Sequence, residues 1–157
     1  MPPTTSNPTG RRADPFRAFN FLVEVEGIVT GGFMECGGLQ VETEIQEYAE
    51  GGLNGYTHHF RGRTKYPPLT LKRGMTFSDQ LWRWHQEVVE GKFERKNGTI
   101  YLMDETQTAV VWWNFKKAFP SKWTGPDLRA NSTDVAVESV EMIHEGLSLS
   151  YAPGQRG

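Results

Sequence analysis

The feature that most constrains this chain is the alternation of two kinds of residue along several short segments. Two interleaved sets make up the first segment, residues 17–27: Phe19, Phe21, Val23 and Val25 in one, and Asn20, Leu22, Glu24 and Glu26 in the other. A period of two places successive side chains on opposite faces of a strand. Glycine is 17 of 157 residues and aromatic residues are 12%, which favours strands and tight turns over a helical bundle.

The same pattern predicts several more strands, at 28–36, 39–49, 69–73, 98–104, 109–119 and 133–147, with a short one at 56–60. Within 39–49, the side chains of Glu42, Glu44 and Gln46 fall on one face, which is therefore rich in carboxylates. Within 109–119, one face carries Val111, Trp113, Phe115 and Phe119, interrupted by Lys117.

The last predicted strand, 133–147, has an apolar phase that shifts part-way along. Val135 and Val137 share one phase, and Val140 and Met142 share the other. Such a shift predicts a bulge near Ser139. A helix competes for these residues, but their many β-branched side chains favour a strand.

One helix is predicted, over residues 78–90. Ser78 is placed to cap its first turn, and Gly91 stands where a left-handed C-terminal residue belongs. A single apolar stripe follows from four positions at helical spacing, Leu81, Trp84, His85 and Val88.

The remaining segments set the domain organisation. Residues 1–14 are polar and proline-rich and predict a flexible arm, residues 15–152 one β domain, and 153–157 a flexible end. Residues 50–66 interrupt the strands as a long glycine-rich and cationic loop, and a helical turn is possible at 126–131. Strands in runs with one helix predict a mainly β fold, an antiparallel sandwich or partial barrel with one flanking α-helix.

Composition excludes several classes of protein. A net charge of -2 argues against a dedicated nucleic-acid-binding domain, which normally has a strongly basic surface. One cysteine, Cys36, excludes an internal disulfide and a multi-cysteine zinc site. We find no run of about 18 apolar residues for a transmembrane helix, and the first residues have no apolar core of a secretory signal.

No catalytic, cofactor or metal site emerges. His58 and His59 are adjacent, so on a strand they point to opposite faces and cannot easily share one ion. Cys36 has no local motif that would pair it with His85 or His144 as nucleophile and base, which favours an inert, partly buried thiol. Glycine-rich pieces match neither phosphate-binding motif. We therefore predict that the chain is not an enzyme.

Opposite charges lie close together in the sequence. An acidic strand carries Glu42, Glu44 and Glu47, and a basic stretch follows with Arg61, Arg63, Lys65, Lys72 and Arg73. Complementary patches favour self-association, with the basic loop of one copy meeting the acidic face of the next. A small β-barrel that binds a ligand or nucleic acid through the 56–66 loop is the alternative.

Several segments together resemble the tail tube proteins of contractile-tailed phages and of phage-tail-like contractile injection systems. They are DPFRAFNFLVEVEG, GGFMECGGLQVETEIQEYAEGG, KYPPLTLKRGMT, LWRW, NGTIYLMDE, WWNFKKAFPSKWTGPDL and VAVESVEMIHEGL, in this order. The likeness covers residues 14 to about 150. It implies hexameric rings whose sheets join into one continuous inner β-barrel, stacked into a hollow tube inside a contractile sheath.

The resemblance also implies partners and roles. Its partners would be further copies of the chain, the sheath, baseplate or initiator and terminator proteins, and DNA or a protein effector as cargo, without stable membrane anchoring. Assembly would take place in the bacterial cytoplasm, and the product would be part of a virion or an extracellular or cell-attached injection particle. A tube-initiator protein near the baseplate is an alternative within the same family.

Individual residues receive roles from this resemblance. Glu42, Glu44 and Gln46 would line the lumen. The 50–66 loop would reach the adjacent ring or subunit through Tyr56, His58, His59, Arg61, Arg63 and Lys65. The helix bearing Leu81, Trp84 and Val88 would cover the outer face of the sheet, near the sheath.

Overall fold

A computed structural model describes residues 16–17, 20–28, 32–49 and 57–154. Nine strands and one helix follow each other in the order β1 (Phe21–Val25), β2 (Phe33–Gly37), β3 (Glu42–Ala49), β4 (Thr57–Lys65), β5 (Leu69–Gly74), α1 (Gln80–Val89), β6 (Lys96–Met103), β7 (Ala109–Thr124), β8 (Val137–Ile143) and β9 (Gly146–Tyr151). All pairings between strands are antiparallel. The prediction of a mainly β fold with one flanking helix is confirmed. The predicted flexible arm at 1–14 lies outside the described residues.

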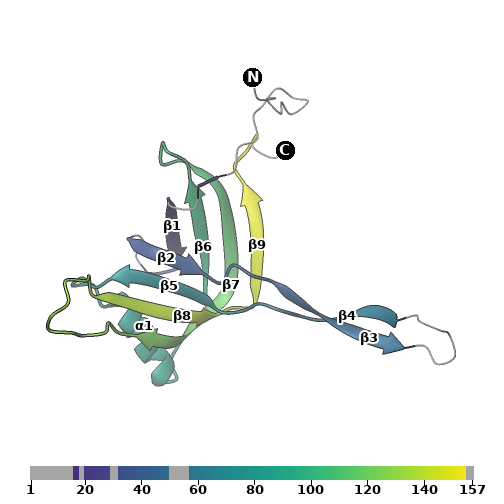
Figure 1. The fold of residues 1–157 in the computed structure, drawn as a ribbon, viewed down its shortest axis with the longest axis horizontal. Coiled ribbons are helices and arrows are strands. Elements are labelled where there is room, and N and C mark those ends of the chain that lie inside the picture. Colours follow the sequence, from purple (N-terminus) through teal and green to yellow (C-terminus); the bar gives the residue numbers. More distant parts are fainter. Residues whose placement is uncertain (1–15, 18–19, 29–31, 50–56, 155–157) are drawn as a thin grey trace.

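The long strand β7 joins two halves of a seven-stranded sheet. Its first part pairs with β6 and β9, and β1 pairs with the far side of β6. Its second part pairs with β8, which leads through β5 to β2. Figure 1 shows the two halves running across one another, and the helix contacts β7. The fold is thus a bent sheet that packs against itself.

The space between the two halves holds the hydrophobic core. Its fully buried members include Val23, Leu71, Phe115, Val140 and Met142, each with no exposed surface. Alternating positions of β5 and β8 are buried, as period-two patterning requires. Each such side chain stabilises the fold by about 1.5–3 kcal/mol through removal of apolar surface from water.

One buried ion pair lies within this core. Arg73 Nε on β5 donates to Glu138 Oε1 on β8 at 2.6 Å, and Trp123 Nε1 on β7 donates to the other carboxylate oxygen at 3.1 Å. Arg73 also donates to the carbonyl of Ser78 at 3.4 Å. The pair therefore ties three neighbouring strands to the start of the helix, with its charges satisfied by hydrogen bonds.

Strands β3 and β4 form a separate two-stranded hairpin that projects far from the body (Figure 1). The short strand predicted at 56–60 is confirmed for residues 57–60, but it extends to Lys65 as strand β4, so the prediction of a loop is wrong for residues 61–65. An apolar alternation did not mark β4 because neither of its faces is buried: its residues are exposed except for the half-buried Gly62. The rest of the predicted loop, 50–56 with Tyr56, lies outside the described residues.

The helix is confirmed, but its predicted cap is not. It begins after Asp79, and no side chain caps its first turn, so the capping role expected of Ser78 is wrong. The Ser78 amide instead donates to the Thr76 hydroxyl at 3.2 Å, which is a turn within the approach to the helix. Gly91 has φ +75°, which confirms the predicted left-handed C-terminal residue.

Two irregularities in β7 change which of its residues face the core. Lys117 has φ 53°, and the pairing register with β6 shifts there, so the buried positions move from Phe115 to Ala118. The alternation predicted that Phe119 shares the face of Phe115. This prediction is wrong, because the shift turns Phe119 to the other face. It packs on the ring of Phe93 at a centroid distance of 5.0 Å.

The second irregularity lies opposite β8. The pairing of β7 with β8 shifts between Pro120 and Lys122, whereas β8 pairs with β5 in continuous register. The bulge predicted near Ser139 is therefore wrong: it lies in β7, because β8 is buried between two strands and stays regular. The predicted strand 133–147 is two strands, β8 and β9, separated at His144 and Glu145. Residues 126–131 form a turn without a helix.

Candidate assembly surfaces

The hairpin pairs its acidic strand with its basic strand. Glu44 on β3 lies 2.6 Å from Lys65 Nζ on β4, and Glu47 lies 3.6 Å from His59 Nε2. Within one chain the acidic and basic segments are adjacent antiparallel strands and pair with each other, so the expected contact between the basic segment of one copy and the acidic face of another stays a prediction. Arg61 and Arg63 remain without an ionic partner among the described residues.

The two faces of the hairpin differ in chemistry. On one face Ile45 stands opposite Arg61, and Thr43 opposite Thr64. The other face carries Glu42, Glu44 and Gln46, which do lie together as predicted, but with Tyr48 and Phe60 among them at a ring distance of 6.3 Å. His58 packs on Phe60, and His59 points to the opposite face with Glu47.

The hairpin exposes large apolar side chains to solvent. Ile45, Tyr48 and Phe60 are 59%, 56% and 52% exposed. An isolated two-stranded hairpin is marginally stable in water at best. This element therefore has the chemistry of a surface that becomes buried on association.

The first half of the sheet ends at strands that have one free edge. Strand β9 pairs with β7 alone, and β1 pairs with β6 alone, among the described residues. The sequence of β9, GLSLSY, has no charge and no proline, and Leu149 and Tyr151 are exposed. Soluble proteins normally protect such an edge with charges, prolines or bulges. An unprotected edge is suited to pairing with another strand.

The end of the molecule opposite the hairpin exposes a second apolar cluster. Here the β5–α1 connection lies against the β7–β8 connection: the Met75 amide donates to the Ala136 carbonyl at 2.8 Å. Leu128 and Val135, 85% and 69% exposed, line one hollow there, and Phe77 of the β5–α1 connection is fully exposed. Sequence reasoning missed this cluster, because its members are scattered and lie outside any periodic segment.

The helix residues singled out from the sequence point inward. Leu81 and Trp84 belong to the buried core, and Val88 is half-buried. They hold the helix on the body, so an outer partner would meet other residues of the helix. Trp82 is one of these, since it is 44% exposed and packs edge-on against Trp123 at 4.8 Å.

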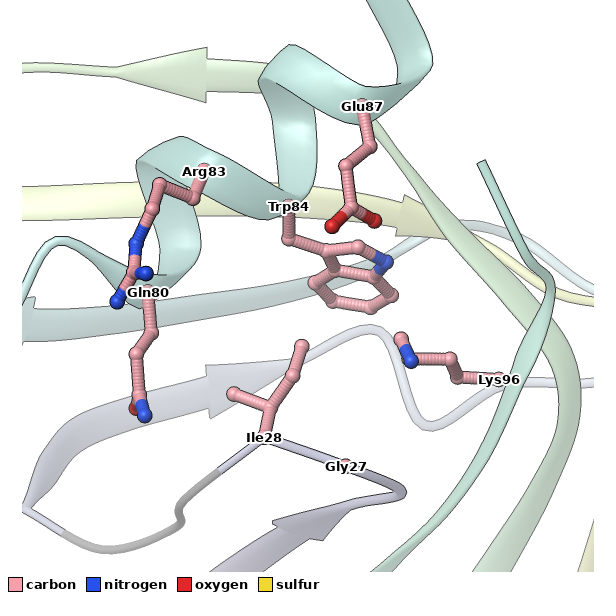
Figure 2. A pocket seen from close by; sticks show the side chains of 7 residues that line it. All are labelled: Gly27, Ile28, Gln80, Arg83, Trp84, Glu87 and Lys96. Atoms are coloured by element: carbon pink, nitrogen blue, oxygen red, sulfur yellow. The ribbon is translucent and has the colours of Figure 1, made fainter. Parts of the chain in front are cut away.

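A cavity of about 300 Å³ opens beside the helix, lined by Gly27, Ile28, Gln80, Arg83, Trp84, Glu87 and Lys96. Figure 2 shows the indole of Trp84 at its centre, over Ile28, with Glu87 and Lys96 on either side of the ring nitrogen. Trp84 Nε1 is buried and has no hydrogen-bond partner among the described residues. Because this nitrogen is closed to solvent, the cavity does not offer it as a donor to a partner.

Neither the cysteine nor the histidines assemble into a reactive group in the described part of the chain. Burial raises the pKa of the Cys36 thiol to about 11, which keeps it protonated and unreactive at neutral pH. His144 lies between the carbonyls of Gly146 and Pro67 at 3.1 and 3.2 Å. Within the residues that the structure describes, no three His, Cys, Asp or Glu side chains are grouped to hold a metal ion. The described helix is too short and too polar to cross a membrane.

Comparison of the sequence with known families identifies the family of this chain. Residues 17–148 match the family described as T4-like virus tail tube protein gp19. The chain belongs to the T4-like tail tube protein family. It is therefore a structural tube protein, and the likeness inferred from its motifs is confirmed. Comparison with curated protein sequences found no significant match.

Solved structures agree with this family. A chain in the extended sheath–tube complex of an extracellular contractile injection system, PVC, is 26% identical with a TM-score of 0.79, over 88% of this chain and 93% of that one. A chain in the tube-terminating cap of the anti-feeding prophage is 25% identical with a TM-score of 0.81, over 89% and 93%. Hcp1 from Flavobacterium johnsoniae, at 16% identity and a TM-score of 0.54 over 84% and 95%, shares the fold.

Proposed function

We propose that this tail tube protein forms the shaft of the inner tube of a contractile injection particle or phage tail. Six copies close into a ring, and rings stack into a hollow tube that is driven through a target envelope. Family membership and the likeness to chains of sheath–tube and cap assemblies support this function. The single observation that carries it is the pair of free sheet edges, β1 and the uncharged β9, on one chain.

The two edges give a physical route to a ring. When the edge of one copy pairs with an edge of the next, the backbone groups of both find partners, and the sheet continues from copy to copy. Contacts between two different surfaces close into a ring when the rotation between copies closes. A barrel of many more than ~16 strands encloses water, so a hexamer of such sheets leaves a channel.

The route through β1 and β9 makes the sheet half formed by β1, β6, β7 and β9 the wall of the channel. Its outer face carries a row of polar side chains across all four strands: Glu24, Thr99, Asn114 and Ser148. Lys116 lies close to this row, so charges of both signs are present. A lumen with charges of both signs would hold neither DNA nor a protein effector tightly, which permits passage of either.

The lumen role expected of Glu42, Glu44 and Gln46 stays a prediction. These residues share their hairpin face with Tyr48 and Phe60, both more than half exposed. Aromatic rings gain free energy from burial, so this face favours contact with a neighbouring copy over contact with water. We assign the hairpin, with His58, His59, Arg61, Arg63 and Lys65, to contacts between copies.

We place the helix on the outside of the tube, towards the sheath. The exposed side of the helix is the contact, and Trp82, 44% exposed, would pack against a sheath segment. Trp82→Ala removes this apolar surface, so it should leave tubes intact but weaken sheath binding at least about 5-fold, the effect of roughly 1 kcal/mol. Met34→Ala, which truncates a side chain 59% exposed on β2, is the matched control away from the helix.

Baseplate or initiator proteins and terminator proteins complete the proposed set of partners, and DNA or a protein effector is the cargo. Assembly in the bacterial cytoplasm precedes incorporation into the particle. The chain alone, imaged by negative-stain electron microscopy with light scattering across concentration, tests the proposal. Rings or hollow rods with a central pore are expected. A chain that stays monomeric at high concentration, even when seeded with an initiator ring, would contradict it.

A further inference from the structure

The β3–β4 hairpin and the apolar cluster beside α1 lie at opposite ends of the longest axis of the molecule (Figure 1). A head-to-tail assembly uses two different surfaces of one chain, which must be complementary to each other.

The far end combines exposed apolar side chains with charged groups around one hollow. A cavity of about 290 Å³ is lined by Asp127, Leu128, Arg129, Ser132, Asp134, Val135 and Ala136. Leu128 and Val135 are 85% and 69% exposed. Neither the two carboxylates nor the Arg129 guanidinium has an ionic partner among the described residues. The acceptor end thus offers two exposed apolar side chains beside charged groups in which negative charge exceeds positive.

One face of the hairpin end carries an exposed apolar side chain beside a cation. Ile45, 59% exposed, stands directly opposite Arg61 on the neighbouring strand. The Arg61 guanidinium has no carboxylate partner in the described part of the chain, since Glu44 pairs with Lys65 and Glu47 lies 3.6 Å from His59. An apolar side chain beside an unpaired cation can meet exposed apolar side chains beside unpaired anions.

We propose that the Ile45–Arg61 face of the hairpin seats in the Leu128–Val135 cavity of a second copy of this chain. Ile45 covers Leu128 and Val135, and Arg61 pairs with Asp127 or Asp134. The contact supplies the hairpin with the apolar burial it lacks in the single chain. The proposal rests on the tube function and adds the surface that receives the hairpin.

Crosslinking tests the contact directly. Cys36→Ser gives a cysteine-free background, into which Ile45→Cys and Leu128→Cys are introduced together. A disulfide requires Cα atoms within about 7 Å, so mild oxidation of assembled tubes should link copies only if the two sites meet. A non-reducing gel should then show a ladder. A ladder that ends at the hexamer places the contact within a ring, and a longer ladder places it between rings.

The matched control pairs Ile45→Cys with Val89→Cys, an apolar residue of α1 that is 66% exposed. Tubes that form normally but crosslink no better through Leu128 than through Val89 would overturn the docking proposal while leaving the tube function intact. Preferential crosslinking through Val89 would place the hairpin on the helix. Absence of tubes from Cys36→Ser alone, before the two cysteines are introduced, would overturn both proposals.

A charge exchange provides a second readout. Arg61→Glu should raise the concentration at which half the protein assembles by about tenfold, the effect of roughly 1.4 kcal/mol per contact. Reversal of Asp127 and Asp134 to Arg in the same chain should restore assembly, whereas Arg83→Glu on α1 should change little. Failure of the exchange to restore assembly above the level of Arg61→Glu would contradict the pairing.

Discussion

The body of this protein and its β3–β4 hairpin are built from the same kind of strand but are stabilised in different ways. In the body, strands β5 and β8 bury every second side chain in a common core. In the hairpin, no residue with a described side chain is buried, and large apolar side chains are exposed. The body folds by its own core, whereas the hairpin depends on what it meets. A region without a core is best understood as half of an interface.

The largest expected difference in stability between the two regions comes from truncating one apolar side chain in each. Phe115 has no exposed surface. Phe115→Ala should therefore lower the free energy of unfolding by about 3–5 kcal/mol, because a cavity forms in the core. Ile45→Ala should change the stability of the monomer by less than about 0.5 kcal/mol. Urea denaturation of unassembled protein measures both. Equal losses would contradict the division into two regions.

The second contrast concerns ion pairs. Glu138→Leu leaves the buried Arg73 without a carboxylate and should cost about 3–5 kcal/mol. The double variant with Arg73→Met should recover much of that loss, because the unpaired charge is gone. On the hairpin, Glu44→Leu breaks a pair whose side chains are 46% and 57% exposed, and should cost at most about 1 kcal/mol. Thermal or urea unfolding of the three variants checks the order.

The connection from β2 to the hairpin offers a sharper pair of variants. Gly38 has φ +90°, and a Cβ there would collide with the Pro68 carbonyl, so Gly38→Ala should cost about 1–3 kcal/mol. Gly37, its neighbour, has open space around the same position, and Gly37→Ala should be nearly neutral. We expect Gly38→Ala to impair assembly as well, because it would change the direction of the hairpin. Normal tubes from this variant would argue against a fixed direction.

The smallest expected effect is a local pH dependence at the turn between β6 and β7. Hydrogen bonds from the Thr106 hydroxyl and from the amides of Thr108 and Thr106 lower the pKa of Asp104 below its ordinary 3.8. The turn should be fully ordered above pH 3.8, where the Asp104 carboxylate is ionised and accepts these hydrogen bonds. It should loosen as the pH falls through the lowered pKa and the carboxylate becomes protonated. Asp104→Asn should remove this step. Amide exchange at Thr108 between about pH 6 and pH 2 measures it.

Much of the body could be predicted from the sequence, because buried apolar side chains recur at regular intervals along its strands and helix. Val23 and Val25 in β1, and Leu81 with Trp84 in the helix, all face the core as their spacing predicted. The bulge at Lys117 could not be predicted. A lysine rarely adopts a positive φ, and the pairing of β7 with three different strands imposes it there.

The hairpin and the assembly surfaces were harder to predict for a physical reason. Strand β4 has two exposed faces, so its sequence carries no alternation, and its second part was expected to be a loop. Leu128 and Phe77 lie in connections where apolar residues follow no period. Their exposure becomes apparent only in the folded structure, and its role requires contact with another copy of the chain.

Hydrogen exchange in the monomer and in assembled tubes tests the central claim most directly. Amides of the body, such as those of Leu71 and Val140, should be protected in both states. Amides of Ile45 and Arg61 should exchange quickly in the monomer and should become at least 100-fold more protected in the tube, because assembly gives the hairpin a partner. Unchanged exchange at Ile45 and Arg61 between monomer and tube would contradict the account.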